Sequence, residues 1–206
     1  YGAGEARAME EEMLAYAGRF DAAFTDGVDE RMWPIAQEWQ HLRQWEVVAS
    51  GLDYPTGWFG AAKVVEAFGD IATYENADNW MRVNRHAKNP ESIATIVFAS
   101  TQNGRLQDTV EAVKTMVAMG RPTMVITDAE AALFDAGAHV FQIPTTPLVW
   151  AKPLMQYAPL GNLMGYIAKL RGASFYRYGG ENDWYIKKLQ QRLGDEITNQ
   201  PLVLVR

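Results

Sequence analysis

Lys63 and Glu66 form a pair of side chains whose types and spacing suit acid–base chemistry. They lie three residues apart in a predicted helix over residues 57–68, so both point from one face of that helix. A carboxylate beside an ammonium group can act as a general base whose pKa is set by its neighbours. The same spacing is typical of an exposed ion pair with no catalytic role.

His86 is the histidine best placed to be a second acid–base group. It lies in the polar segment 75–90, whereas His139 falls in an apolar predicted strand and His41 in a predicted helix. A loop histidine is a better candidate acid or base than a strand histidine, although it can equally be an exposed surface residue. No grouping of His, Asp and Glu has the spacing of a metal site, and we predict no cofactor.

Three polar segments that follow predicted strands are candidate substrate-binding loops: 50–56, 100–104 and 127–128. Ligands of open α/β sheets bind beyond the carboxyl ends of the strands, where hydroxyl and backbone N–H groups can hold an anion. The alternative is that these are ordinary turn and helix-capping residues. The residues predicted to bind substrate in the first two loops are Ser50, Gly51, Asp53, Tyr54, Ser100, Thr101, Gln102 and Asn103.

Short apolar runs that alternate with helical segments must position these loops. This alternation indicates βαβ units and a parallel sheet, and a near-continuous apolar run such as 93–99 indicates burial on both faces. We therefore expect an α/β fold with a doubly wound, mainly parallel, five-stranded sheet flanked by helices. The predicted strands are 45–49, 71–74, 93–99, 123–127 and 139–143, and the predicted helices between and after them are 57–68, 104–119, 130–136 and 155–171.

The ends of the chain are predicted to lie outside the sheet. Residues 1–44 are expected to form connector helices, 45–172 the main domain, and 173–206 a tail with a polar helix near 183–193. The apolar end, 201–206, can add an edge strand or pack on a partner. An apolar stripe on the first helix needs a cover, which favours a homodimer.

Composition excludes several classes of function. The 206 residues carry 25 acidic and 19 basic side chains, and the net charge of -6 argues against nucleic-acid binding by bulk charge. The absence of cysteine excludes disulfides and thiolate zinc sites and fits a reducing compartment, so we expect a cytoplasmic protein. No apolar run approaches the ~18 residues of a membrane span, and no signal peptide opens the chain, so we expect no membrane partner.

The order of these pieces over residues 45–171 resembles a sugar isomerase (SIS) domain of flavodoxin-like topology. A finer similarity is to the second SIS half of double-SIS proteins, such as the isomerase part of glutamine–fructose-6-phosphate aminotransferase and the fructosamine-6-phosphate deglycases. There, a glycine loop ending in Tyr-Pro leads into a helix carrying Ala-x-Lys-x-x-Glu. Here, Gly51, Tyr54, Pro55 and residues 61–66 correspond to that motif.

The resemblance implies a sugar-phosphate isomerase or deglycase that needs no cofactor. Glu66 would move a proton between C1 and C2 of a ketose or aldose phosphate or its amine adduct, Lys63 would support it, and His86 would open the sugar ring. The segment 175–178 resembles the arginine–tyrosine tail of the deglycases, which makes Arg177 a candidate substrate contact.

Two departures from the family pattern keep other functions open. Ala87-Lys88 follows His86 where the family has Gly-Pro, and residues 100–105 replace a Ser-x-Ser-Gly-x-Thr phosphate loop. That loop belongs to the first half of double-SIS proteins, so its absence is expected in a second half, and a first half, if the protein has one, lies outside this 206-residue sequence. The alternatives are a non-catalytic phosphosugar-binding regulatory domain and a scaffold half that completes another half's site.

Overall fold

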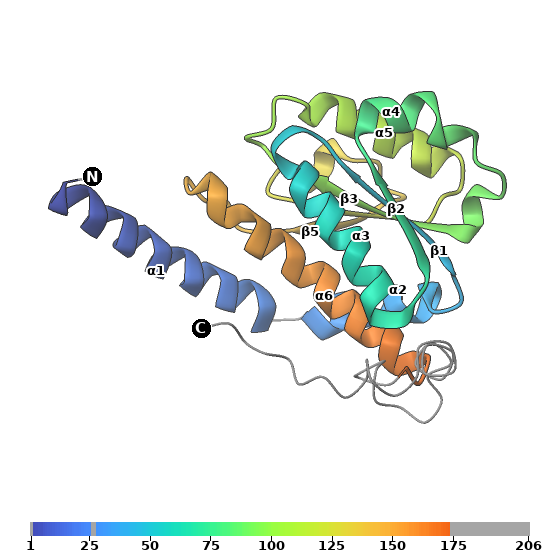
Figure 1. Cartoon of the computed structure of the whole chain (residues 1–206), viewed down its shortest axis with the longest axis horizontal. Helices are drawn as coiled ribbons and strands as arrows, with labels where there is room; N and C mark the ends of the chain where they lie inside the picture. Colours follow the sequence, from blue (N-terminus) through green and yellow to red (C-terminus); the bar gives the residue numbers. More distant parts are fainter. Residues whose placement is uncertain (1, 26–27, 174–206) are drawn as a thin grey trace, which may run out of the picture.

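A parallel sheet forms the centre of the computed structural model, which describes residues 2–25 and 28–173 (Figure 1). All neighbouring strands in it are parallel, which confirms the predicted doubly wound α/β fold. The strand order β2-β1-β3-β4-β5 reverses direction between β1 and β3, the point where ligands of such sheets bind. The strands are β1 (Gln44–Ala49), β2 (Ile71–Glu75), β3 (Ile93–Ala99), β4 (Thr123–Thr127) and β5 (His139–Gln142).

Helices cover both faces of this sheet (Figure 1). On one face lie α1 (Ala3–Thr25), α2 (Val28–Trp39), α3 (Tyr54–Phe68) and α6 (Lys152–Leu170), and on the other α4 (Ala77–Arg82) and α5 (Leu106–Ala118). Along β3, Ile96 and Phe98 belong to the first core, and Val97 and Ala99 to the second. Burial on both faces explains why this strand is a continuous apolar run.

Two glycines set the place of α3 on the sheet. A Cβ added at Gly57 would lie 2.7 Å from the Cβ of Ala49 on β1, and one at Gly60 would lie 2.9 Å from Cδ2 of Leu160 on α6. Larger residues at either position would force α3 away from the strand and from α6. The helix that carries Lys63 and Glu66 is therefore packed closely against both.

Two segments differ from the prediction. The helix expected at 130–136 is only a short 3-10 turn, Ala131–Leu133, because the Asp135 side chain accepts a hydrogen bond from the Gly137 N–H at 2.9 Å and favours a turn. The polar segment 75–90 contains α4, which was not predicted. Asn76 caps this helix by accepting from the Asn79 N–H at 2.8 Å.

Several predictions fall outside the described residues or stay untested. Arg177, the helix near 183–193 and the apolar end 201–206 lie outside the described residues. The division into 1–44, 45–172 and 173–206 stays a prediction. Within the described ranges, no helix is long and apolar enough to cross a membrane.

A buried ion pair fixes α4 and its following turn onto the sheet. Arg121 donates to the carboxylate of Glu46 on β1, and both side chains are almost fully buried. The indole N–H of Trp80 donates to the same carboxylate at 2.7 Å, and Asn84 donates to its second oxygen. Burial of two charges is tolerated here because the carboxylate is surrounded by donors.

We expect Arg121→Met to lower the free energy of unfolding by about 3–5 kcal/mol, because it leaves the Glu46 charge buried without its partner. Urea unfolding followed by circular dichroism measures this loss. Arg105→Met is the matched control, since Arg105 pairs with Asp108 on the surface and its removal should change stability by less than ~1 kcal/mol. Equal effects of the two substitutions would contradict the structural role of Arg121.

Candidate functional site

The loops predicted to bind substrate meet at the carboxyl edge of the sheet. The loop after β1, the loop after β3 and Asp128 after β4 are brought together because parallel strands end at the same edge. Hydrogen bonds join all three to α6 and its preceding loop. The predicted parallel sheet therefore places these loops at one edge, and their role in binding substrate stays a prediction.

Asp53 is the centre of the first hydrogen-bond network in these loops. Its buried carboxylate accepts from the backbone N–H of Ser100 at 3.0 Å and also from the Ser100 hydroxyl. It accepts from the side-chain amides of Asn103 at 3.0 Å and Gln156 at 2.7 Å. These polar groups are satisfied inside the protein, so they are not open to a ligand in this conformation.

Asp128 is the centre of a second network. It accepts from the Thr101 N–H at 2.8 Å and the Thr101 hydroxyl at 3.0 Å, and from the Lys152 ammonium at 2.6 Å. Lys152 is buried and is the first residue of α6, where the helix dipole disfavours a cation, so the Asp128 charge is needed beside it. Gln102 donates to the Thr146 carbonyl at 3.0 Å.

A polar pocket of about 420 Å³ remains open beside these networks. Ser50, Gly51 and Tyr54 line it, together with Arg105, a cation that sequence reasoning missed. Partial burial and the neighbouring Tyr74 raise the pKa of the Tyr54 phenol. The remaining lining residues are Asn76, Asp78 and Asn79.

Lys63 and Glu66 lie in a different place, a groove of about 700 Å³ between α3 and α6. Their ammonium and carboxylate groups are 2.5 Å apart, and the Glu66 side chain is 62% exposed. Tyr157 and Lys169 of α6 also line this groove, and neither was predicted as a site residue. Burial raises the pKa of Tyr157, while nearby Lys63 lowers it and Glu66 raises it.

The two places are separated along α3. This helix begins at Tyr54 beside the loops, and Glu66 follows twelve residues later. At about 1.5 Å per residue, the separation along the helix axis is about 18 Å. One small sugar phosphate cannot therefore contact the carboxyl-edge loops and Glu66 of the same chain.

His86 is not brought to the Lys63–Glu66 pair within one chain. It is exposed in the 3-10 turn Asn84–His86 that follows α4, and α4 lies on the opposite face of the sheet from α3. Its ring nitrogen accepts only from neighbouring Arg85, at 3.3 Å, among the bonds seen. No group of three or more His, Asp or Glu side chains within the described ranges is arranged to hold a metal ion.

Comparisons with solved structures identify the architecture. The chain is similar to the C-terminal domain of glucosamine-fructose-6-phosphate aminotransferase from Francisella tularensis, with a TM-score of 0.69 and 16% identity over 84% of this chain. It is also similar to the sugar isomerase domain of the RpiR transcription factor from Sphaerobacter thermophilus, with a TM-score of 0.66 and 17% identity over 89% of this chain. The chain has the SIS fold.

The other comparisons limit what this fold implies. Tagatose-6-phosphate ketose/aldose isomerase from Escherichia coli is a third similar structure, with a TM-score of 0.60 and 16% identity over 75% of this chain and 43% of its own. The chain spans 48% of the aminotransferase structure but 97% of the RpiR structure. No protein-family model and no curated protein matches the sequence. The SIS fold therefore occurs here on a sequence far from these enzymes and this regulator.

We expect Asp53→Ala to lower the free energy of unfolding by at least about 3 kcal/mol, because it leaves several buried donors of the SIS loops without an acceptor. Asp78→Ala is the control, since Asp78 lies at the open pocket and makes an exposed pair with Arg82. Chemical unfolding of both variants measures the difference. Similar small losses would mean that the Asp53 network is not structural.

Proposed function

We propose that this chain is part of a sugar-phosphate isomerase or deglycase in which Glu66 transfers a proton between C1 and C2. The observation that carries this proposal is the exposed Glu66 carboxylate, held by Lys63 in the open groove between α3 and α6. A general base must be positioned and reachable by substrate, and this carboxylate is both. Lys169, at the same groove, adds a second ammonium group that favours an anionic sugar phosphate.

The proton transfer is the same in both reactions. Glu66 removes a proton from C1 of the ketose phosphate while the C2 carbonyl oxygen gains one, which forms a C1–C2 double bond. Return of the proton to C2 and loss of the C1 hydroxyl proton gives the aldose phosphate. When C1 carries an amine nitrogen instead, the product is a C1 imine, and water hydrolyses it to the aldose phosphate and the free amine.

A second SIS half or a second copy would complete this site. The polar loops of the chain are about 18 Å from Glu66 along α3, by the rise of an α-helix. The phosphate of a substrate at Glu66 would therefore be held partly by another chain or half, and His86 would act only in such an assembly. Exposed Trp58 on α3 is apolar surface that a homodimer contact would cover.

A non-catalytic phosphosugar-binding domain is the second candidate. The similarity to nearly the full length of the RpiR sugar isomerase domain favours it, because that domain belongs to a transcription factor. The distance between His86 and the Lys63–Glu66 pair also favours it. In this case, sugar phosphates would bind and stabilise the protein without being converted.

We expect Glu66→Gln to lower the rate of fructose 6-phosphate or fructosamine 6-phosphate conversion by about 100- to 10,000-fold in the full-length protein, because general-base catalysis has that magnitude. Product formation by nuclear magnetic resonance measures the rate. The melting temperature should change little, since the Glu66 side chain is mostly exposed.

Glu111→Gln is the matched control, as Glu111 is an exposed glutamate on α5, on the other face of the sheet. It should keep the full rate. A folded Glu66→Gln variant with an undiminished rate would remove Glu66 as the base. Binding without conversion by the unsubstituted protein would favour the regulatory function.

A further inference from the structure

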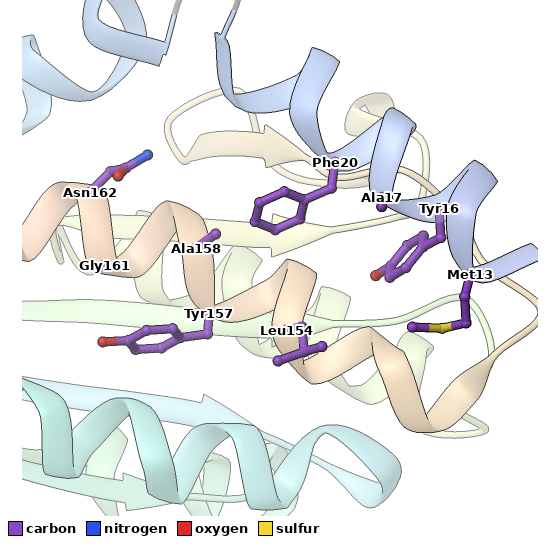
Figure 2. A pocket seen from close by; sticks show the side chains of 9 residues that line it. All are labelled: Met13, Tyr16, Ala17, Phe20, Leu154, Tyr157, Ala158, Gly161 and Asn162. Carbon is purple, nitrogen blue, oxygen red and sulfur yellow. The ribbon is translucent and has the colours of Figure 1, made fainter. Parts of the chain in front are cut away.

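An apolar groove of about 550 Å³ lies between α1 and α6 (Figure 2). Met13, Tyr16 and Phe20 of α1 point toward α6, and Leu154 stands on the α6 side. No side chain that lines the groove carries a charge at neutral pH. Its volume is in the range of small-molecule sites, which are mostly apolar with few polar groups. The other lining residues are Ala17, Tyr157, Ala158, Gly161 and Asn162.

Tyr16 contributes the one hydroxyl group on the α1 wall of this groove. Tyr16 is 4% exposed, and its hydroxyl is buried with no hydrogen-bond partner among the described residues. Burial and, after it, the negative charge of Asp128 raise the pKa of the Tyr16 phenol, whereas the positive charge of Arg19 lowers it. The result is a pKa of about 12. The hydroxyl is therefore protonated at neutral pH and is a donor that no acceptor among the described residues satisfies. A buried hydroxyl without a partner is unfavourable, so a ligand acceptor would stabilise it.

The apolar groove adjoins the Lys63–Glu66 groove across α6. Both are lined by Tyr157 and Gly161. The Tyr157 ring lies beside Gly161, where an added Cβ would be only 3.6 Å and 3.7 Å from two ring carbons. Because Gly161 has no side chain, the surface of α6 is lower at this position. The Tyr157 ring borders both grooves there.

We infer that the apolar groove is a second subsite of the Lys63–Glu66 groove and takes an apolar amine substituent of a fructosamine 6-phosphate. The inference rests on the proposed function and specifies its substrate class. The charged sugar phosphate faces Lys63, Glu66 and Lys169, and the substituent on the C1 nitrogen extends past Tyr157 between α1 and α6.

The chemistry of the two grooves favours this occupant over a free sugar phosphate alone. Two ammonium groups and a carboxylate line one groove and suit an anionic sugar, whereas the other has apolar walls that a hydrated sugar would not fill favourably. A substrate that is polar at one end and apolar at the other matches both. The single buried hydroxyl of Tyr16 suits a substituent with one acceptor atom near its end.

The test compares the affinity of the full-length protein for three probes by calorimetry. They are fructose 6-phosphate and two 1-amino-1-deoxyfructose 6-phosphates whose C1 nitrogen carries the residue of ethanolamine (the ethanolamine adduct) or of 4-methoxyphenethylamine (the apolar adduct). The apolar adduct should bind at least about tenfold more tightly than the ethanolamine adduct, because burial of its ring removes apolar surface from water. Leu154→Lys should abolish this difference and leave fructose 6-phosphate binding unchanged. Leu154 is 66% exposed, so the substitution should not disturb folding.

Val149→Lys is the matched control, since Val149 is an exposed apolar residue near the start of α6 that does not line the groove, and it should keep the preference. Equal affinity for the two adducts, with fructose 6-phosphate bound, would overturn the inference and leave the proposed function standing. Failure of all three probes to bind would overturn both. Dissociation of a dimer by Leu154→Lys, with no effect on ligand preference, would assign the groove to a second copy.

Discussion

The direction of α3 on the sheet is the constraint on which the site depends. Because β1 is parallel to its neighbours, α3 begins at the carboxyl edge and carries Glu66 about 18 Å away from it. Gly57 and Gly60 hold the helix against β1 and α6, so this separation is built into the packing. A single chain therefore has an exposed carboxylate in one groove and polar loops elsewhere, which is why the proposed catalysis needs a second half or subunit.

Internal hydrogen bonds at the carboxyl edge bear on the choice between enzyme and regulator. Asp53 is bonded to Ser100, Asn103 and Gln156, and Asp128 to Thr101 and Lys152. These groups hold the loops to α6, and a polar pocket of about 420 Å³ is open beside them. This hydrogen-bonded edge of the sheet would have the same fixed geometry in an enzyme and in a regulator. The exposed Lys63–Glu66 pair favours the enzyme over the regulator, because an ion pair that only stabilises its helix needs no groove beside it.

The sheet and the meeting of its loops could be predicted because apolar runs mark buried parallel strands and such strands end at one edge. The contact of Lys63 with Glu66 followed from helical spacing. The partners of Asp53 could not be predicted, because Gln156 is 103 residues away and no local pattern joins them. α4 was missed because its formation depends on the Asn76 cap and on burial of Trp80, a tertiary contact.

Hydrogen exchange at the substrate tests the central claim most directly. The full-length protein is incubated in deuterium oxide with fructose 6-phosphate, and separately with a fructosamine 6-phosphate, and nuclear magnetic resonance follows the signals of the hydrogens at C1. If the Glu66 carboxylate is the proton carrier, deuterium enters at C1 with at least one of these substrates and does not enter with folded Glu66→Gln protein. Exchange at the same rate in that variant, or no exchange by the unsubstituted protein while it binds the sugar phosphate, would contradict the account.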